Sequence, residues 1–168
     1  GAEPQVTVER ITVTDADGDS NVGTGKISGA YNFNGDADYI EVANFSQHFT
    51  TAMTLSAWVQ PCCDAPASHD GFFGIRNGDT DHNFYALQTS GTSNLEFRFR
   101  NSAGASWTIT ESSAVSPDTW IHVTLTYDGD TLTTYLDGDF ASGDTNATGA
   151  FSSSAYPLRM ATDGTNNR

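Results

Sequence analysis

The sequence is poor in basic residues, poor in cysteine and free of long hydrophobic runs. Only 7 lysines and arginines stand against 21 aspartates and glutamates, so the 168 residues carry a formal net charge of −14. Phosphate backbones and anionic lipid surfaces are held by Lys and Arg, and this balance therefore argues against nucleic acid and membrane surfaces as partners. No apolar run approaches the roughly 20 residues that span a bilayer, so membrane insertion is not expected.

The cysteines are two adjacent residues, Cys62 and Cys63. Consecutive Cα atoms lie about 3.8 Å apart, which is less than the separation in most disulfides, so a bond between these two would be unusual. Intermolecular pairing, a vicinal ring and two free thiols are all open at this point. With two soft ligands and no histidine spaced nearby, the pair does not predict a zinc site.

No stretch of the sequence has a helical period. Short β-prone runs recur instead, separated by clusters of Gly, Asp, Asn and Ser, which is typical of a β-sandwich or jelly roll. The sequence predicts strands at 5–14, 28–34, 38–43, 53–60, 71–77, 83–89, 94–100, 105–111, 119–127, 131–137 and 156–162.

Within these runs apolar and polar side chains alternate. Phe97 and Phe99 share one face of 94–100, and Ile121 and Val123 share one face of 119–127, with polar residues on the other faces. Successive side chains of a strand point to opposite sides, so each strand has one face for a core and one for solvent or a ligand. Two antiparallel sheets packed face to face satisfy this pattern, and we expect these four side chains to be buried.

Three blocks, 25–42 (GKISGAYNFNGDADYIEV), 49–61 (FTTAMTLSAWVQP) and 118–138 (DTWIHVTLTYDGDTLTTYLDG), stand in order along the chain, followed by YPLRMATDG at 156–164. Together they resemble the laminin-G-like and pentraxin-related jelly rolls of the concanavalin A-like lectin/glucanase superfamily. The resemblance implies an all-β, two-sheet antiparallel sandwich, one domain over residues 1–168, that is extracellular or displayed on a surface.

The sequence departs from that family at its C-terminal end. Members usually continue into a closing strand of the form Gly-x-Ile-Asp-x-Val, whereas this sequence ends in TDGTNNR. Either the sequence is a fragment, or another segment fills the edge. The N-terminal 5–14 and a strand from a neighbouring subunit are the two candidates, because an unpaired edge invites aggregation.

The carboxylate pattern of catalysis is missing. Glucanases of this fold place Glu-x-Asp-x-Glu on one strand, so that two carboxylates face one groove. Here Glu96 is followed at alternate positions by Arg98 and Arg100. The four histidines (His48, His69, His82 and His122) have no serine or cysteine partner at motif spacing. We therefore expect no enzyme.

One candidate calcium loop is DADGDSN, where Asp15, Asp17, Asp19 and Asn21 offer the oxygen ligands that Ca²⁺ takes. It is not an EF-hand, because glycine falls at the fourth loop position and Lys26 stands where a bidentate Glu is needed. A solvated acidic turn explains the same residues equally well.

A second calcium candidate comes from the resemblance. In the pentraxin branch an Asp-Asn pair before the matching strand and the loop after the penultimate strand hold the ion. By position Asp81 and Asn83 correspond to the first group, and Asp163 and Asn166 to the second. The spacing is inexact, and the acidic run of the pentraxin site is absent.

For ligand contact we select Trp107, Tyr85, Arg98 and Arg100. Aromatic rings stack on sugar faces when exposed, although most aromatics of sandwich strands are packing residues. Trp107 follows a flexible loop and is expected to expose its ring. The two arginines are either a solvated stripe or part of a polar binding face, where guanidiniums meet hydroxyls or carboxylates.

Together these observations indicate a non-catalytic recognition module with a glycan or another cell-surface ligand as partner and Ca²⁺ as a structural or ligand-bridging ion. The alternative is a structural module that self-associates through an open sheet edge, as in a filament, appendage or capsid decoration. A glycan-degrading enzyme with carboxylates drawn from different strands is a weaker alternative.

Overall fold

The structure, a computed structural model, describes residues 11–14, 21–33, 38–43, 45, 51–76, 82–151 and 156–162. The elements named within these residues are all β-strands, and each strand pairing is antiparallel. The described part of the chain contains no helix long and apolar enough to cross a membrane. The predicted all-β class is confirmed.

The larger of the two main sheets has seven strands. Their spatial order is β1 (Ile11–Thr14), β4 (Tyr39–Val42), β13 (Leu158–Met160), β6 (Asp70–Arg76), β7 (His82–Gln88), β8 (Leu95–Arg100) and β9 (Ser106–Glu111). β1, from the end of the predicted N-terminal strand, pairs with β4 at one edge of this sheet.

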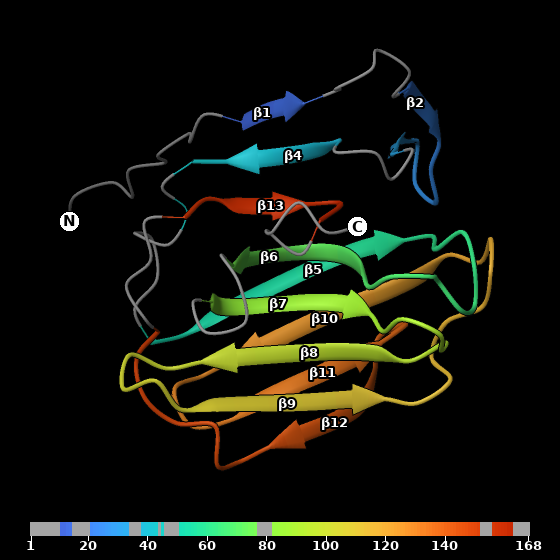
Figure 1. The fold of residues 1–168 in the computed structure, drawn as a ribbon. Coiled ribbons are helices and arrows are strands. Elements are labelled where there is room, and N and C mark those ends of the chain that lie inside the picture. The colour runs from blue at the N-terminus through green and yellow to red at the C-terminus, as the bar shows by residue number, and fades with distance from the viewer. Residues whose placement is uncertain are drawn as a thin grey trace.

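The smaller main sheet has four strands. Their order is β12 (Asp139–Asp144), β11 (Leu132–Leu136), β10 (Ile121–Tyr127) and β5 (Met53–Val59). Figure 1 shows β6 to β9 crossing in front of these strands, so the two sheets form the layers of a sandwich. A separate hairpin of β2 (Asn21–Thr24) and β3 (Gly29–Asn32) lies at one end.

The core lies between the two sheets and follows the alternation seen in the sequence. In β8 buried and half-buried residues alternate over all six positions, and in β10 over all seven. Phe97, Phe99, Ile121 and Val123 all lie in the buried cluster, as predicted. Burying a large apolar side chain contributes about 1.5–3 kcal/mol, so this shared face is the main force that holds the layers together.

Two tight turns connect the strands of the smaller sheet. Between β10 and β11 the Asp128 carboxylate accepts the backbone N–H groups of Asp130 and Thr131 at 3.0 and 2.8 Å. Between β11 and β12 the two turn residues, Asp137 and Gly138, have φ of 53° and 92°. Two successive positive φ values are typical of the type I′ turn that suits a two-residue hairpin.

The predicted strands agree with the observed ones to within about two residues wherever the structure describes the chain. Residues 5–10 of the first predicted strand lie outside the described residues. Two observed strands, β2 and β12, were not predicted, because neither has an alternating apolar pattern.

Candidate binding face

The outer side of the larger sheet carries a row of polar side chains that crosses six strands. The pairing registers align Glu41 with Arg159, Arg159 with Gly74, Gly74 with Tyr85, Tyr85 with Arg98 and Arg98 with Thr108. Arg76, Glu96 and Arg100 lie on the same side, next to this row. We call this surface the arginine face; its residues are Glu41, Arg76, Tyr85, Glu96, Arg98, Arg100, Thr108 and Arg159.

Tyr85 lies beneath two guanidinium groups. Its ring is only 1% exposed, and the Cζ atoms of Arg76 and Arg98 lie 4.6 and 5.6 Å from the ring centroid. A cation over an aromatic ring is attracted by about 0.5–2 kcal/mol, depending on desolvation. Tyr85 was predicted to contact a ligand. In this position its ring is not an open platform for a sugar, and it supports the two arginines instead.

The glycine opposite Tyr85 makes this arrangement fit. A Cβ atom added to Gly74 would lie 2.6 Å from the Tyr85 Cβ and 3.1 Å from the Phe84 carbonyl oxygen. Real Cβ atoms do not approach other atoms to 2.6 Å, so any larger residue at position 74 would push β6 and β7 apart.

Arg98 and Glu96 lie two residues apart on the same side of β8. The Arg98 Nε atom is 2.7 Å from Glu96 Oε1, but the geometry is too bent for a hydrogen bond. Both atoms are buried without a hydrogen-bond partner, although the side chains as a whole are 33% and 13% exposed. These two atoms are closed to a ligand, so the donors and the acceptor still open are the other nitrogens of Arg98 and the second oxygen of Glu96.

The other ion pair of the arginine face is complete. Arg159 Nε donates a hydrogen bond to Glu41 Oε2 at 3.1 Å, and the Arg159 Cζ lies 4.7 Å from the centroid of the Tyr39 ring. This guanidinium is held in place by both contacts.

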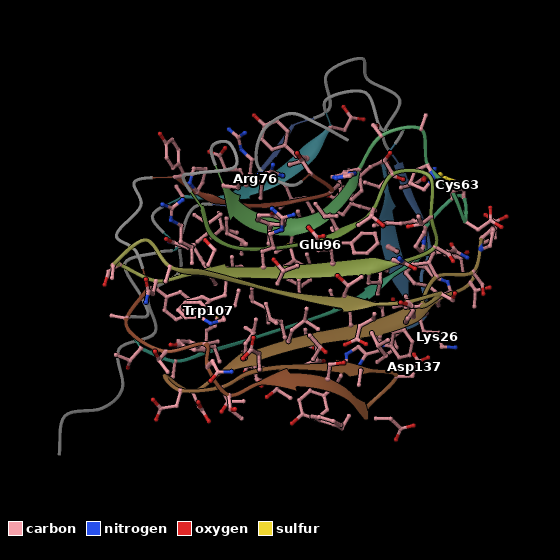
Figure 2. The ribbon with its side chains drawn as sticks, turned by 60° about the horizontal axis from the view of Figure 1, so that its bottom comes forward. Lys26, Cys63, Arg76, Glu96, Trp107 and Asp137 are labelled. Atoms are coloured by element: carbon pink, nitrogen blue, oxygen red, sulfur yellow. The ribbon has the colours of Figure 1, made fainter. Side chains whose placement is uncertain are left out.

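Basic residues are concentrated on this surface. Arg76, Arg98, Arg100 and Arg159 are four of the 7 lysines and arginines in the chain. Figure 2 shows Arg76 and Glu96 along the larger sheet, whereas Lys26, whose Nζ lies 5.2 Å from the Trp58 ring centroid, is beside β5 of the smaller sheet. The arginine face thus differs in charge from the chain as a whole.

Trp107 lies on the other side of the same sheet. Its ring stacks on Phe99, with centroids 5.6 Å apart, and it packs half-buried against the core. Three of the four predicted ligand-binding residues therefore lie on the arginine face, and Trp107 does not. Trp107 does follow a loop, as the sequence indicated. In the register of β9, however, it pairs with Phe99, and its ring faces the core.

The outer side of the smaller sheet brings together a serine and a histidine that sequence spacing could not connect. Ser56 Oγ lies 2.7 Å from His122 Nε2, and the His122 ring packs 4.9 Å from that of Trp58. The two residues are not at motif spacing in the sequence, and it is the pairing of β5 with β10 that brings them together. The Asp137 carboxylate accepts a hydrogen bond from the backbone N–H of His122, and this bond does not orient the imidazole ring. Among the described residues no carboxylate hydrogen-bonds to the His122 ring, so the pair lacks the third group of a catalytic triad there.

The same outer surface exposes aromatic rings that the sequence did not single out as ligand contacts. Phe140 is 67% exposed, and its ring meets that of Tyr135 edge to face at 6.2 Å. Thr124 and Thr133 continue this surface toward the neighbouring strands. It is the alternative platform for a flat ligand.

A cavity of about 1100 Å³ lies between the β2–β3 hairpin and the edge formed by β5, β6 and β13. Its walls are largely aromatic and apolar: Tyr31, Phe33, Trp58, Phe72, Trp120 and Met160. Ligand pockets of proteins have volumes of about 300–1,000 Å³, so this cavity is a third place where a ligand could bind.

Cys62, Cys63 and Asp70 line this cavity and offer three ligand atoms within 4.8 Å of one another. The Cys62 and Cys63 sulfurs lie 3.1 Å apart, and this thiol contact together with burial raises the pKa of Cys63 to about 11. Burial also raises the pKa of Asp70. The sequence had suggested only the two cysteines as ligands. The third ligand, Asp70, begins β6, seven residues after Cys63.

The predicted calcium ligands are mostly outside the described residues, namely Asp15, Asp17, Asp19, Asp81, Asp163 and Asn166. Asn21 begins β2, where its backbone pairs with Asn32, and Asn83 is buried in β7. The described residues do not bring either predicted group together, so both calcium sites stay predictions.

The family model for the concanavalin A-like lectin/glucanases superfamily matches residues 34–168. The chain belongs to this superfamily. The superfamily model covers every strand of both main sheets except β1. A search of curated proteins finds no match.

Solved structures agree with membership of the superfamily at the level of the fold. The binding domain of Paraclostridial Mosquitocidal Protein 1 aligns with a TM-score of 0.73 and 19% identity over 94% of this chain and 40% of its own. Domain 4 of AbnA, an extracellular arabinanase from Geobacillus stearothermophilus in complex with arabinotriose, aligns with a TM-score of 0.61 and 19% identity. The alignment covers 92% of this chain and 73% of that domain structure. The botulinum neurotoxin serotype D ligand binding domain in complex with N-acetylneuraminic acid aligns with a TM-score of 0.68 and 12% identity. That alignment covers 90% of this chain and 37% of the toxin domain. The chain thus spans about two fifths of the length of the two toxin structures.

Proposed function

We propose that the chain is a non-catalytic carbohydrate-binding module that holds its ligand on the arginine face. The observation that carries the proposal is the Arg98–Glu96 pair, whose facing atoms are buried and make no hydrogen bond. Nε and Oε1 are enclosed by the pair itself, but the two side chains are 33% and 13% exposed, and sugar hydroxyls are donors and acceptors that could meet their remaining polar atoms.

Two further facts support this proposal. Two of the similar structures contain a sugar, arabinotriose in one and N-acetylneuraminic acid in the other. The arginine face also presents its polar groups from paired strands held by the core, and sites built on such elements keep their geometry better than sites on loops.

The test is a glycan array probed with the labelled chain, followed by calorimetry on the glycans that bind. Replacing Arg98 with Gln should weaken binding about 10- to 100-fold, because a hydrogen bond to a charged group contributes about 1.5–3 kcal/mol. Tyr135→Ser and Phe140→Ser lie on the opposite surface and serve as controls that should bind normally.

The result also discriminates between the three surfaces. Loss of binding in Phe140→Ser alone would move the site to the smaller sheet, and loss in Trp120→Ala alone would move it to the cavity. An array with no bound glycan, in buffer with millimolar calcium, would refute the carbohydrate proposal.

Calcium is a separate part of the proposal, and it rests on the acidic loops of the sequence. An ion that binds only the folded chain raises its stability by mass action, by about 2.7 kcal/mol at a hundredfold excess over the dissociation constant. We expect the melting temperature to rise with added Ca²⁺ and to fall with chelator. An unchanged melting temperature at millimolar calcium would exclude a structural ion.

Self-assembly is a second candidate function, favoured by the edge of the smaller sheet. Among the described strands β5 has a paired neighbour only in β10, and the exposed Phe140 lies on the same sheet. An open edge can pair with a strand of another copy. Light scattering at neutral pH would then give a mass that grows with concentration, and a constant monomer mass would exclude this candidate.

A further inference from the structure

We infer that the glycan held by the arginine face is acidic and that Arg98 binds its carboxylate. This inference rests on the proposed function and adds the chemical class of the sugar. It concerns uronic or similar carboxylated sugars, as opposed to the neutral ones.

The first argument is the distribution of charge. Four of the chain's 7 basic residues lie on this one side of one sheet, with two glutamates, Glu41 and Glu96, as the carboxylates of the defined face. Charges beyond about 8 Å are largely screened at physiological ionic strength. Among the described residues, a small ligand on the face therefore meets these four guanidiniums and two carboxylates at short range.

The second argument is the state of Arg98. Its guanidinium makes no hydrogen bond within the described part of the chain; its contacts there are the bent approach to Glu96 and the stacking over Tyr85. A guanidinium has five N–H donors in a planar fork that matches a carboxylate. With one side chain oxygen already near Nε, the outer edge of the fork is the part that remains for a ligand carboxylate.

The third argument is the pairing of a donor with an acceptor. At the non-reducing end of an oligogalacturonide the carboxylate on C5 is adjacent to a free hydroxyl on C4, whereas the other residues are linked through that oxygen. Arg98 can donate to the carboxylate while the nearby Glu96 accepts a hydrogen bond from the hydroxyl. A neutral hexose satisfies Glu96 equally well but offers Arg98 only a hydroxyl oxygen, whereas a carboxylate carries a negative charge and two oxygens that can accept two parallel N–H bonds from the guanidinium.

Tyr85 has the part of a positioning residue in this arrangement. It is buried under Arg76 and Arg98 and limits where the two planar groups can lie. Less conformational freedom is then lost when Arg98 binds a ligand, which favours the bound state.

The experiment compares matched oligosaccharides by calorimetry. The probes are oligogalacturonides, the same oligomers after carboxyl reduction to neutral galactose units, and sulfated galactan oligosaccharides of similar length. We expect the uronate to bind at least tenfold more tightly than its reduced form. Sulfated oligomers should bind no more tightly than the uronate, because a sulfate ester takes the place of a hydroxyl that could donate to Glu96.

Variants locate the effect. Arg98→Gln should abolish the preference for the uronate, and Arg98→Lys, which keeps the charge but not the fork, should reduce it. Thr54→Glu is the matched control: it changes the net charge by the same one unit, but Thr54 is exposed on the outer side of β5 in the other sheet. It should keep the full preference. Unfolding curves confirm that each variant folds.

The outcomes separate this inference from the proposed function. Equal binding of the uronate and its reduced form, a preference that survives in Arg98→Gln, or tighter binding of sulfated oligomers would each overturn the inference. Array binding of neutral glycans alone would overturn it while leaving the carbohydrate proposal intact. An empty array would remove both.

Discussion

Replacing Gly74 with alanine tests the packing on which the arginine face depends. The new Cβ would lie 2.6 Å from the Tyr85 Cβ and 3.1 Å from both the Tyr85 Cα and the Phe84 carbonyl oxygen. All three atoms belong to or directly join the backbone of β7, so no side-chain rotation relieves the clash. Overpacking of this kind typically costs about 1–3 kcal/mol. The lower entropy of the unfolded alanine chain returns about 0.4–1 kcal/mol, so we expect a net loss of roughly 1–2 kcal/mol.

Urea unfolding followed by tryptophan fluorescence measures this loss, with an unchanged m-value expected because the same surface is exposed. Gly23→Ala is the matched control, since a Cβ there meets no atom within 4 Å and φ is not positive. It should be neutral or slightly stabilising. Because the clash moves Tyr85, Gly74→Ala should also weaken glycan binding. If Gly74→Ala is as stable as Gly23→Ala and binds equally well, the close approach of β6 and β7 is not as described.

Three further changes test other parts of the fold. The Tyr127 hydroxyl lies 2.9 Å from the Gly129 oxygen and 2.6 Å from the Gly149 oxygen, so Tyr127→Phe should cost about 1–2 kcal/mol in urea unfolding; no change would show these contacts to be replaceable by water. Backbone N–H donors lower the pKa of Asp128 below its ordinary value of 3.8, so the charged carboxylate stabilises the fold at neutral pH. This contribution is lost as the pH falls through the folded-state pKa. The difference in unfolding free energy between the chain and Asp128→Asn should therefore be constant above about pH 5 and shrink in acid, and a difference independent of pH would contradict the assigned charge effect. A pKa of about 11 leaves Cys63 protonated at pH 8, so site-resolved alkylation should be more than about tenfold slower than for a free cysteine, and an equal rate would contradict the thiol contact.

The fold followed from the sequence because the strong strands alternate. β5, β8 and β10 each place apolar residues at every second position, and that period alone determines which side meets the core. β12 was missed because its sequence, DFASGD, contains one large apolar residue. The available signal was the turn before it: Asp137-Gly138 is a hairpin dipeptide, and such a turn requires a returning strand.

The candidate site followed only in part, because it depends on contacts across strands. Arg98 and Arg100 were found from their alternation with Phe97 and Phe99. The burial of Tyr85 was not found from the sequence, because its ring is covered by Arg76 from one neighbouring strand and by Arg98 from the other. The Ser56–His122 contact joins residues 66 positions apart, and no spacing rule reaches that far.

Net charge illustrates the same limit in another way. A value of −14 describes the whole chain and predicts repulsion of long polyanions, whose charges extend over many screening lengths. It does not describe a surface a few residues wide. The alternation that puts Phe97 and Phe99 into the core necessarily puts Arg98 and Arg100 together on the opposite side, so strand geometry creates a basic surface within an acidic chain. A short acidic oligosaccharide interacts mainly with the charges of that surface, whereas a long polyanion also interacts with the net negative charge of the whole chain. We therefore expect affinity for uronates to fall as their length increases beyond the arginine face, which calorimetry on a length series would show; affinity that rises steadily with length would mean that the whole chain, and not this face, governs the encounter.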